Sequence, residues 1–132
     1  MISAANLAEW VRQELDTSQP DIHLVLRAMA KESGEWVKAE PERIPALLAE
    51  PDSPLPVKWR ALIEGLVAYR CNQMDRQRPV WTKATKSPAP WVPYLDAGVP
   101  MSVSLTVFDA LETPAAILDK GIVIPAKALK PV

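Results

Sequence analysis

The fold is decided by the stretch PVKWRALIEGLVAYRCNQM, residues 56–74. Its apolar residues recur at the three- and four-residue spacing of a helical face, and they form a wide stripe. Gly65 lies inside this pattern, where it costs about 1 kcal/mol of helix propensity against alanine. Such a glycine allows a neighbour to approach closely, and Trp10 or Trp36 is the expected neighbour. We therefore expect residues 56–74 to form the central core helix.

Helical patterns also precede this stretch. Ser3 is a suitable N-cap for a helix that runs to about Asp16, because apolar residues then recur on one face. A second helix should begin at residue 20 or 21 and end before Gly34, with residues 36 and 37 either extending it or forming a separate turn. A short helix is expected within residues 41–49, between two proline-containing turns. Residues 1–75 are thus predicted to form a helical core.

The next segment, residues 76–100, is rich in proline and tryptophan. Its first part, residues 76–93, contains four prolines, two tryptophans and no glycine. Proline fixes φ and removes a backbone donor, so neither a regular helix nor a central strand is expected here. Two indoles are poor choices for a flexible linker. We therefore predict an ordered loop that wraps the 56–74 helix.

The tail, residues 101–132, is short and apolar. Apolar and polar residues alternate over 102–108, which is typical of a strand, but the same residues also fit a helical face, so both alternatives stay open. Thr113-Pro114 favours a short helix over 114–119. Residues 122–124 follow a glycine and precede a proline, which predicts a short strand. That strand must pair within the chain, with a second copy or with a partner.

Together these patterns predict a mainly α fold. We expect one domain over residues 1–132, with four or five short helices packed around the 56–74 helix. The wrapping segment and a short C-terminal strand complete this expected architecture.

The composition narrows the class of protein. With 132 residues, 48% hydrophobic content and five tryptophans, the chain is typical of one globular domain. A single cysteine excludes an internal disulfide and favours a reducing cytoplasm. The N-terminus lacks a basic start followed by an apolar core, and no apolar run approaches the ~20 residues of a membrane span. We expect a cytoplasmic protein without a membrane partner.

The sequence offers little for catalysis, metals or cofactors. His23 is the only histidine and Cys71 the only cysteine, and they lie in different segments, which argues against a metal site and a Ser-His or Cys-His pair. Four glycines, in no phosphate-binding pattern, leave no loop to hold a nucleotide. We therefore expect no enzyme activity, no metal and no cofactor.

Charge is distributed unevenly along the chain, although the net charge is −1. Residues 1–57 contain ten acidic and five basic residues, whereas residues 58–86 contain seven basic and two acidic residues. Bases interleaved with aromatic rings can hold a single-stranded nucleic acid. A helical nucleic-acid-binding regulator is therefore the alternative hypothesis, although a pI of 5.8 is low for this class. Its candidate residues are Arg60, Arg70, Arg76, Arg78, Lys83 and Lys86.

Several short runs across residues 55–130 carry a family resemblance. They are WRALIEGLV at 59–67, RPVWT at 78–82, PW at 90–91, TPAA at 113–116 and GIVI at 121–124. In this order they resemble a family of small uncharacterised bacterial proteins encoded beside nucleotidyltransferase-type toxins of the abortive-infection class. The family pattern places a phenylalanine and two basic residues before the glycine, where this chain has residues 117–120. No catalytic residue is carried over by the resemblance.

The resemblance implies an antitoxin-like partner of a toxin. We therefore expect a non-enzymatic bacterial protein-interaction module whose partner is a protein, such as a nucleotidyltransferase-type toxin. A homo-oligomer through the 122–124 strand is a further expectation. The candidate partner-binding residues, chosen because indoles and exposed strand edges contribute much binding energy, are Trp81, Trp91, Ile122, Val123 and Ile124.

Overall fold

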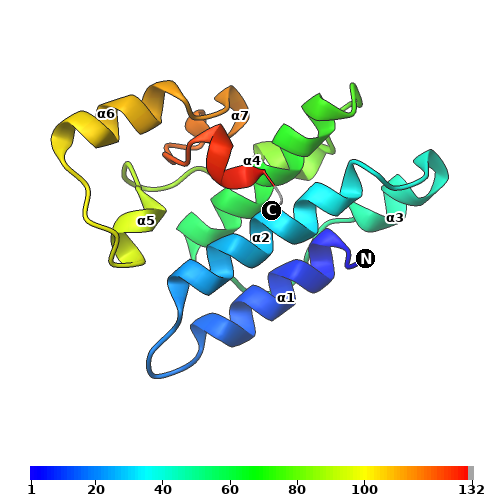
Figure 1. Cartoon of the computed structure of the whole chain (residues 1–132). Helices are drawn as coiled ribbons and strands as arrows, with labels where there is room; N and C mark the ends of the chain where they lie inside the picture. The colour runs from blue at the N-terminus through cyan, green and yellow to red at the C-terminus, as the bar shows by residue number, and fades with distance from the viewer. Residues whose placement is uncertain (131–132) are drawn as a thin grey trace.

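A computed structural model describes residues 1–130 of the chain (Figure 1). Within this range the protein is mainly helical, as predicted, and it has no β-sheet. The helices, in chain order, are α1 (Ala4–Leu15), α2 (Ile22–Trp36), η1 (Pro41–Arg43), α3 (Ile44–Leu47), α4 (Val57–Gln73), η2 (Val80–Lys83), α5 (Pro93–Asp96), α6 (Val103–Leu111), α7 (Ala115–Leu118) and η3 (Ala126–Leu129).

Helix α4 is the centre of the fold, which confirms the expected role of residues 56–74. α1, α2, η2 and α7 all pack against it. From Trp59 to Cys71 every residue except Arg60 and Tyr69 is buried. Glu64 and Arg70 are charged residues of this helix, yet both side chains are buried. α4 is therefore enclosed on nearly all sides rather than on one stripe.

The two N-terminal helices form an antiparallel pair beside α4 (Figure 1). The Ser3 side chain accepts a hydrogen bond from the Asn6 backbone amide at 3.1 Å, which confirms the predicted N-cap of α1. α2 does not end before Gly34 but continues to Trp36, so of the two open alternatives for residue 36 the extension of the helix is the one observed. Trp36 is fully buried and its indole N–H donates to the Ile2 carbonyl at 2.8 Å. Burial of this large ring outweighs the helix cost of one glycine.

Gly65 does allow a close approach to α4, but the neighbour is α7 and not a tryptophan. A Cβ atom at Gly65 would lie 3.3 Å from the Ala116 carbonyl oxygen and 3.2 Å from Lys120 Cγ. Both distances are shorter than ordinary van der Waals contact. The absence of a side chain at Gly65 therefore lets α7 lie directly on α4.

The segment 76–100 carries two tryptophans that both face inward. The Trp81 indole N–H donates to the Leu48 carbonyl at 3.0 Å. The Trp91 ring packs edge-to-face on Trp59, with ring centroids 4.9 Å apart. These contacts fix the segment to α4 and to the end of α3.

In the tail the structure decides one open alternative and contradicts one prediction. Residues 103–111 form helix α6, because Ser102 caps the helix by accepting from the Leu105 amide at 3.1 Å. The predicted strand at 122–124 is wrong: only one isolated parallel bridge joins Trp91 to Ile122. Prolines at positions 90 and 93 flank Trp91 and remove the donors that a longer ladder requires. The short helix predicted over 114–119 is confirmed as α7.

None of the helices within residues 1–130 is long and apolar enough to cross a membrane.

Candidate protein-interaction surface

Helix α6 carries its apolar side chains on the outside. None of its residues, 103–111, is buried. Those partly covered by the rest of the protein are Thr106, Asp109 and Ala110. The apolar residues instead face solvent, with exposed fractions of 83% for Val103, 52% for Leu105, 56% for Val107, 56% for Phe108 and 80% for Leu111. The amphipathic order expected of a surface helix is therefore reversed.

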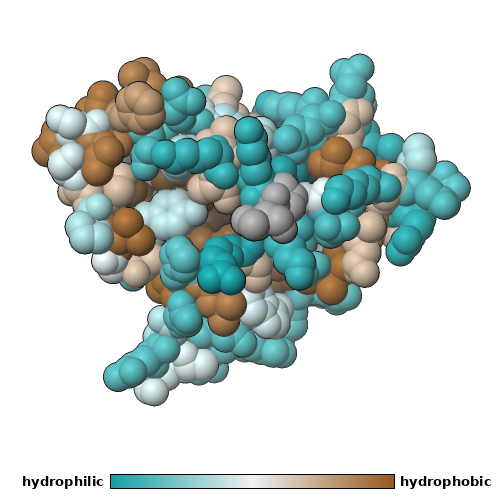
Figure 2. All heavy atoms as spheres, viewed as in Figure 1, coloured by the Kyte–Doolittle hydropathy of each residue, from teal (hydrophilic) through white to brown (hydrophobic). Residues whose placement is uncertain are grey.

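We call these five side chains the α6 face. Figure 2 shows hydrophobic side chains gathered over α6, on the upper left of the molecule. Residues four apart on a helix lie one above the other, so Val103, Val107 and Leu111 form a row, and Phe108 lies beside it. Single exposed apolar residues are ordinary, whereas a contiguous group on one helix marks an interaction site.

Polar residues at both ends hold α6 in its helical form. Ser102 caps the first turn, and the Thr106 hydroxyl donates to the Ser102 carbonyl at 3.0 Å. At the other end the Thr113 hydroxyl donates to the Asp109 carbonyl at 2.7 Å. Because these caps satisfy backbone groups that a helix end leaves unpaired, α6 does not depend on tertiary packing alone.

Backbone hydrogen bonds outside α6 set its position. The Ala126 amide donates to the Glu112 carbonyl at 2.9 Å, which ties the end of α6 to the start of η3. Before α6, the Val99 amide donates to the Tyr94 carbonyl at 3.0 Å and closes the turn after α5. α6 is thus tied to η3 at its C-terminal end, while its outer face stays uncovered.

The surroundings of the α6 face are acidic. Residues 87–119 contain four acidic residues and no basic residue. Glu112 and Asp119 are exposed, and Asp109 is half-buried beside the outer face. Burial raises the pKa of the Tyr94 phenol, and the negative charge of Asp109 raises it further. The chain segment that carries the α6 face therefore combines apolar and acidic residues, while one base, Lys127, is exposed in η3 next to the residue that bonds to Glu112.

The five residues predicted from the sequence to bind a partner do not lie on the α6 face. Trp91, Ile122 and Ile124 belong to the core, with exposed fractions of 7%, 0% and 3%. Val123 is half-buried and its amide donates to the Trp91 carbonyl at 2.9 Å. Trp81 is half-buried, and its indole N–H donates a hydrogen bond to the Leu48 carbonyl. These residues hold the tail and the 76–100 segment against α4 in this conformation.

The bases proposed for nucleic-acid binding do not share one environment. Arg70 is 2% exposed and donates to the carbonyls of Ala30 and Leu129 at 3.1 and 2.7 Å. Arg60 is half-buried and donates to Glu64 and to the Pro51 carbonyl. Only part of the group reaches solvent: Arg76, Lys83 and Lys86 are exposed, and Arg78 is half-buried.

Burial lowers the pKa of Arg70, which nevertheless remains the hydrogen-bonding link between α2, α4 and η3. Its guanidinium also donates to the Ser33 hydroxyl at 3.0 Å. A buried arginine with several carbonyl acceptors is a structural residue, because its donors are already in use.

A buried ion pair that the sequence did not reveal joins α4 to the end of α7. Lys120 Nζ lies 2.9 Å from a Glu64 oxygen, and Glu64 is fully buried. Lys120 also donates to the carbonyls of Thr82 and Thr85, while the Thr85 amide donates to Glu64 at 2.8 Å. This cluster ties α4, η2 and α7 together.

The protonation of Glu64 follows from this cluster. Burial by itself acts to raise the carboxyl pKa, but hydrogen bonds from Lys120, Thr85 and Arg60 outweigh it, so the pKa lies below its ordinary value. Glu64 is therefore ionised at neutral pH and paired on all sides. Glu64 has a structural role, because its carboxylate oxygens accept hydrogen bonds from Arg60, Thr85 and Lys120.

His23 and Cys71, the two residues considered for nucleophilic catalysis, lie in different environments. His23 is exposed on α2, whereas Cys71 is buried in α4. Burial raises the pKa of the Cys71 thiol, which keeps it in the unreactive protonated form. Over residues 1–130, no group of three or more His, Cys, Asp or Glu side chains is placed to hold a metal ion.

Comparisons of this chain with protein-family models, with curated proteins and with solved structures found no match. The interpretation of function therefore depends on the α6 face and its surroundings.

Proposed function

We propose that this protein is a protein-interaction module and that the α6 face is its contact element. The observation that supports the proposal is the outward orientation of five apolar side chains on one short helix. Full burial of a valine, leucine or phenylalanine side chain is worth about 1.5–3 kcal/mol. A partner that covers the α6 face therefore gains affinity from side chains that contribute little to this fold.

The charges around the α6 face define the chemistry of the partner. The charged residues of segment 87–119 are all acidic. The proposed partner is therefore a protein with an apolar groove and basic residues at the rim of that groove. A membrane surface fits less well, because helices that lie on lipid carry lysine and arginine around their apolar face. Nucleic acid is disfavoured at this face by the same negative charge.

The proposed mode of binding is helix-in-groove recognition. An amphipathic helix presents side chains at i, i+4 and i+8 to an apolar groove, as Val103, Val107 and Leu111 do here. The 76–100 segment, wrapped on α4, acts as the fixed connector that presents α6. Because the helix is already formed and capped, binding does not have to order it.

The resemblance to proteins encoded beside nucleotidyltransferase-type toxins gives the proposed biological role. In that role the protein is an antitoxin-like partner that acts in the bacterial cytoplasm and performs no chemistry itself. Trp91, Ile122 and Ile124 are buried, and Trp81 and Val123 are half-buried. We therefore move the proposed contact from these residues to α6.

A comparison of tagged variants in the source cells tests the proposal. The α6 variant carries Val107→Ser and Phe108→Ser, which remove two apolar contacts from an exposed face. The matched control is Val80→Ser, because Val80 is 83% exposed on η2, a different element. Each protein is purified from its own cells at low and high salt, and co-purifying proteins and nucleic acids are identified.

We expect a protein that remains bound at high salt, because apolar burial is not screened. It should be retained by the wild type and by Val80→Ser and lost from the α6 variant. Retention of the same protein by the α6 variant contradicts the proposal. Recovery of nucleic acid alone, released by salt, supports the regulator hypothesis instead.

A further inference from the structure

The main row of the α6 face has the same spacing read from either end. Val103, Val107 and Leu111 recur every four residues, so Val107 lies midway, about 6 Å along the helix axis from each of the other two. When two copies of α6 lie antiparallel with Val107 at the centre, Val103 of one copy therefore lies opposite Leu111 of the other. Every position of the row then meets an apolar side chain.

The side chains beside this row also fit such a pair. Ser104 and Phe108 lie one turn apart, and both are exposed. The small Ser104 side chain leaves space on the helix surface, into which the Phe108 ring of the opposite helix inserts. Interlocking of rows with a four-residue spacing is the commonest way in which helices pack.

α6 lies where a second copy has access to it. Figure 1 shows this helix at the periphery of the molecule, on the upper left. At roughly 150 Å² for a large apolar side chain, the exposed fractions of the five residues amount to about 500 Å² per copy. Two α6 faces thus bury about 1,000 Å², near the lower limit for a specific interface. The area predicts a weak and reversible contact.

The acidic residues of α6 do not oppose this pairing. Asp109 is partly covered by the rest of the protein. The two copies of Glu112 lie at opposite ends of an antiparallel pair, about 15 Å apart along the axis. That separation exceeds the Debye length of about 10 Å at 0.1 M salt, so their repulsion is screened. Each Glu112 comes close to the N-terminal turn of the other α6, where the helix dipole favours negative charge.

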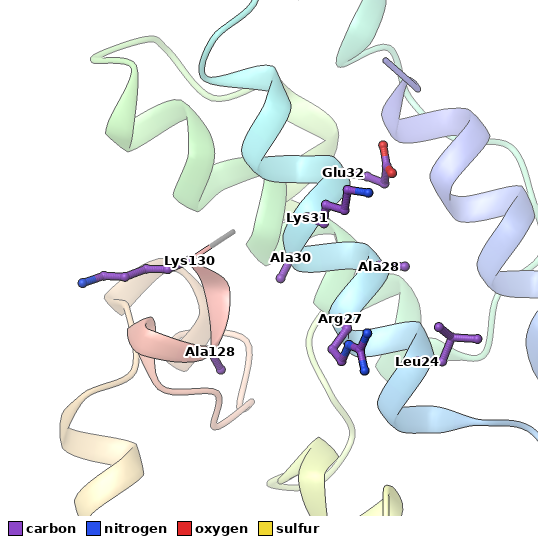
Figure 3. A pocket seen from close by; sticks show the side chains of 8 residues that line it. All are labelled: Leu24, Arg27, Ala28, Ala30, Lys31, Glu32, Ala128 and Lys130. Atoms are coloured by element: carbon purple, nitrogen blue, oxygen red, sulfur yellow. The ribbon is translucent and has the colours of Figure 1, made fainter. Parts of the chain in front are cut away.

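The hollow beside α2 and η3 is a poorer receptor for α6. Its volume is about 600 Å³ (Figure 3). Ala28 and Ala30 lie on opposite sides of α2, however, with Arg27 and Lys31 between them. This hollow therefore offers no continuous apolar floor, whereas α6 of a second copy offers a continuous apolar row.

We propose that two copies of this chain associate by antiparallel pairing of their α6 faces across a two-fold axis at Val107. The inference rests on the proposed role of α6 as a contact element and names a second copy of the chain as one partner for it. Two-fold contacts of this kind, in which both copies use the same surface, are the commonest in soluble oligomers.

The pairing regulates the proposed function. A copy whose α6 is paired has no free α6 face, so a foreign partner competes with the second copy for the same side chains. Because the contact is weak, the free face predominates at low concentration of the chain and the paired form at high concentration. Self-association thus limits the binding of the foreign partner.

Two variants with opposite charges test the antiparallel register. Val103→Glu places a carboxylate opposite Leu111 of the second copy, and Leu111→Lys places an ammonium opposite Val103. These positions are 83% and 80% exposed, so both variants should fold, as circular dichroism will show. The matched control is Val80→Glu, because Val80 is also 83% exposed but lies on η2. Sedimentation velocity is measured from micromolar to millimolar concentration for each protein and for an equimolar mixture of the two α6 variants.

We expect the wild type and Val80→Glu to form a dimer as concentration rises. Each α6 variant alone should associate at least about tenfold more weakly, because a charge faces an apolar side chain at both ends of the pair. The mixture should recover a dimer. One end then pairs the introduced Glu with the introduced Lys, and the other end keeps its original apolar contact.

Three results would overturn the inference: a wild type that is monomeric throughout, an α6 variant that dimerises as strongly as the wild type, or a mixture no tighter than its components. The proposed function is judged separately, by the capture of a foreign protein in cells. It stands when that protein is lost from Val107→Ser with Phe108→Ser, even if the wild type is monomeric, and fails when that protein is retained.

Discussion

Replacement of Lys120 by methionine tests the buried cluster that joins α4, η2 and α7. Methionine is close to lysine in length but lacks the ammonium group. Glu64, which is fully buried, then loses its 2.9 Å partner, and the carbonyls of Thr82 and Thr85 lose their donor. Removal of one member of a buried ion pair costs about 3–5 kcal/mol, because the other charge stays buried.

The lower end of that range applies here. Glu64 keeps hydrogen bonds from Arg60 at 3.0 Å and from the Thr85 amide at 2.8 Å. We therefore expect Lys120→Met to lower the free energy of unfolding by about 3 kcal/mol, out of roughly 5–15 kcal/mol for a typical domain. Urea titration followed by circular dichroism measures it. The control is Lys83→Met, an exposed position, which should change stability by less than about 0.5 kcal/mol.

The pH dependence gives a second readout. The pKa of Glu64 is lowered in the folded protein, so the stabilisation is fully present above the ordinary carboxyl value of 4.5. It is lost as the pH falls from there through the lowered pKa. The stability difference between the wild type and Lys120→Met should therefore shrink in acid. A difference below about 1 kcal/mol at neutral pH, or one that grows in acid, would refute the reasoning.

Three more predictions address α6, Gly65 and Cys71. Phe108→Ser should change the free energy of unfolding by less than about 0.5 kcal/mol, because the ring is 56% exposed; thermal denaturation showing a loss near 3 kcal/mol would mean that α6 is packed against the core. Gly65→Val should destabilise by about 2 kcal/mol in urea titration, since the new side chain meets the Ala116 carbonyl and the backbone of Ile117; an unchanged midpoint would show that α7 can move away. The Cys71 thiol is buried and its pKa is raised by burial, so alkylation by iodoacetamide should be slow in buffer and fast in denaturant; rapid labelling of the folded protein would contradict this burial.

The central helix and the N-cap of α1 were readable from local sequence. Residues 56–74 carry a wide apolar stripe, and Ser3 is followed by a helical period, so these elements follow from spacing and capping alone. The end of α2 was not readable, because the packing of Trp36 carries the helix past Gly34. Long-range contacts of this kind leave no mark in a single sequence.

The tail shows the same limit at the candidate site. Apolar residues at 122–124 form no strand, because the segment that bridges to Ile122 has prolines at positions 90 and 93. Residues 102–108 fit both periods, and the Ser102 cap was the signal for a helix. Which face of that helix would be covered depends on α5 and η3, so its outward apolar face could not be predicted. The sequence did show that residues 87–119, which include α6, contain no basic residue.

Site-specific photo-cross-linking in the source cells tests the central claim most directly. A benzophenone amino acid replaces Phe108, which is 56% exposed on the α6 face, in one variant and Val80, which is 83% exposed on η2, in the other. Irradiation should join position 108 to a partner protein, which mass spectrometry then identifies. Position 80 should give no such product. An absence of protein adducts at position 108 above the level at position 80 would contradict the assignment of α6 as the contact element.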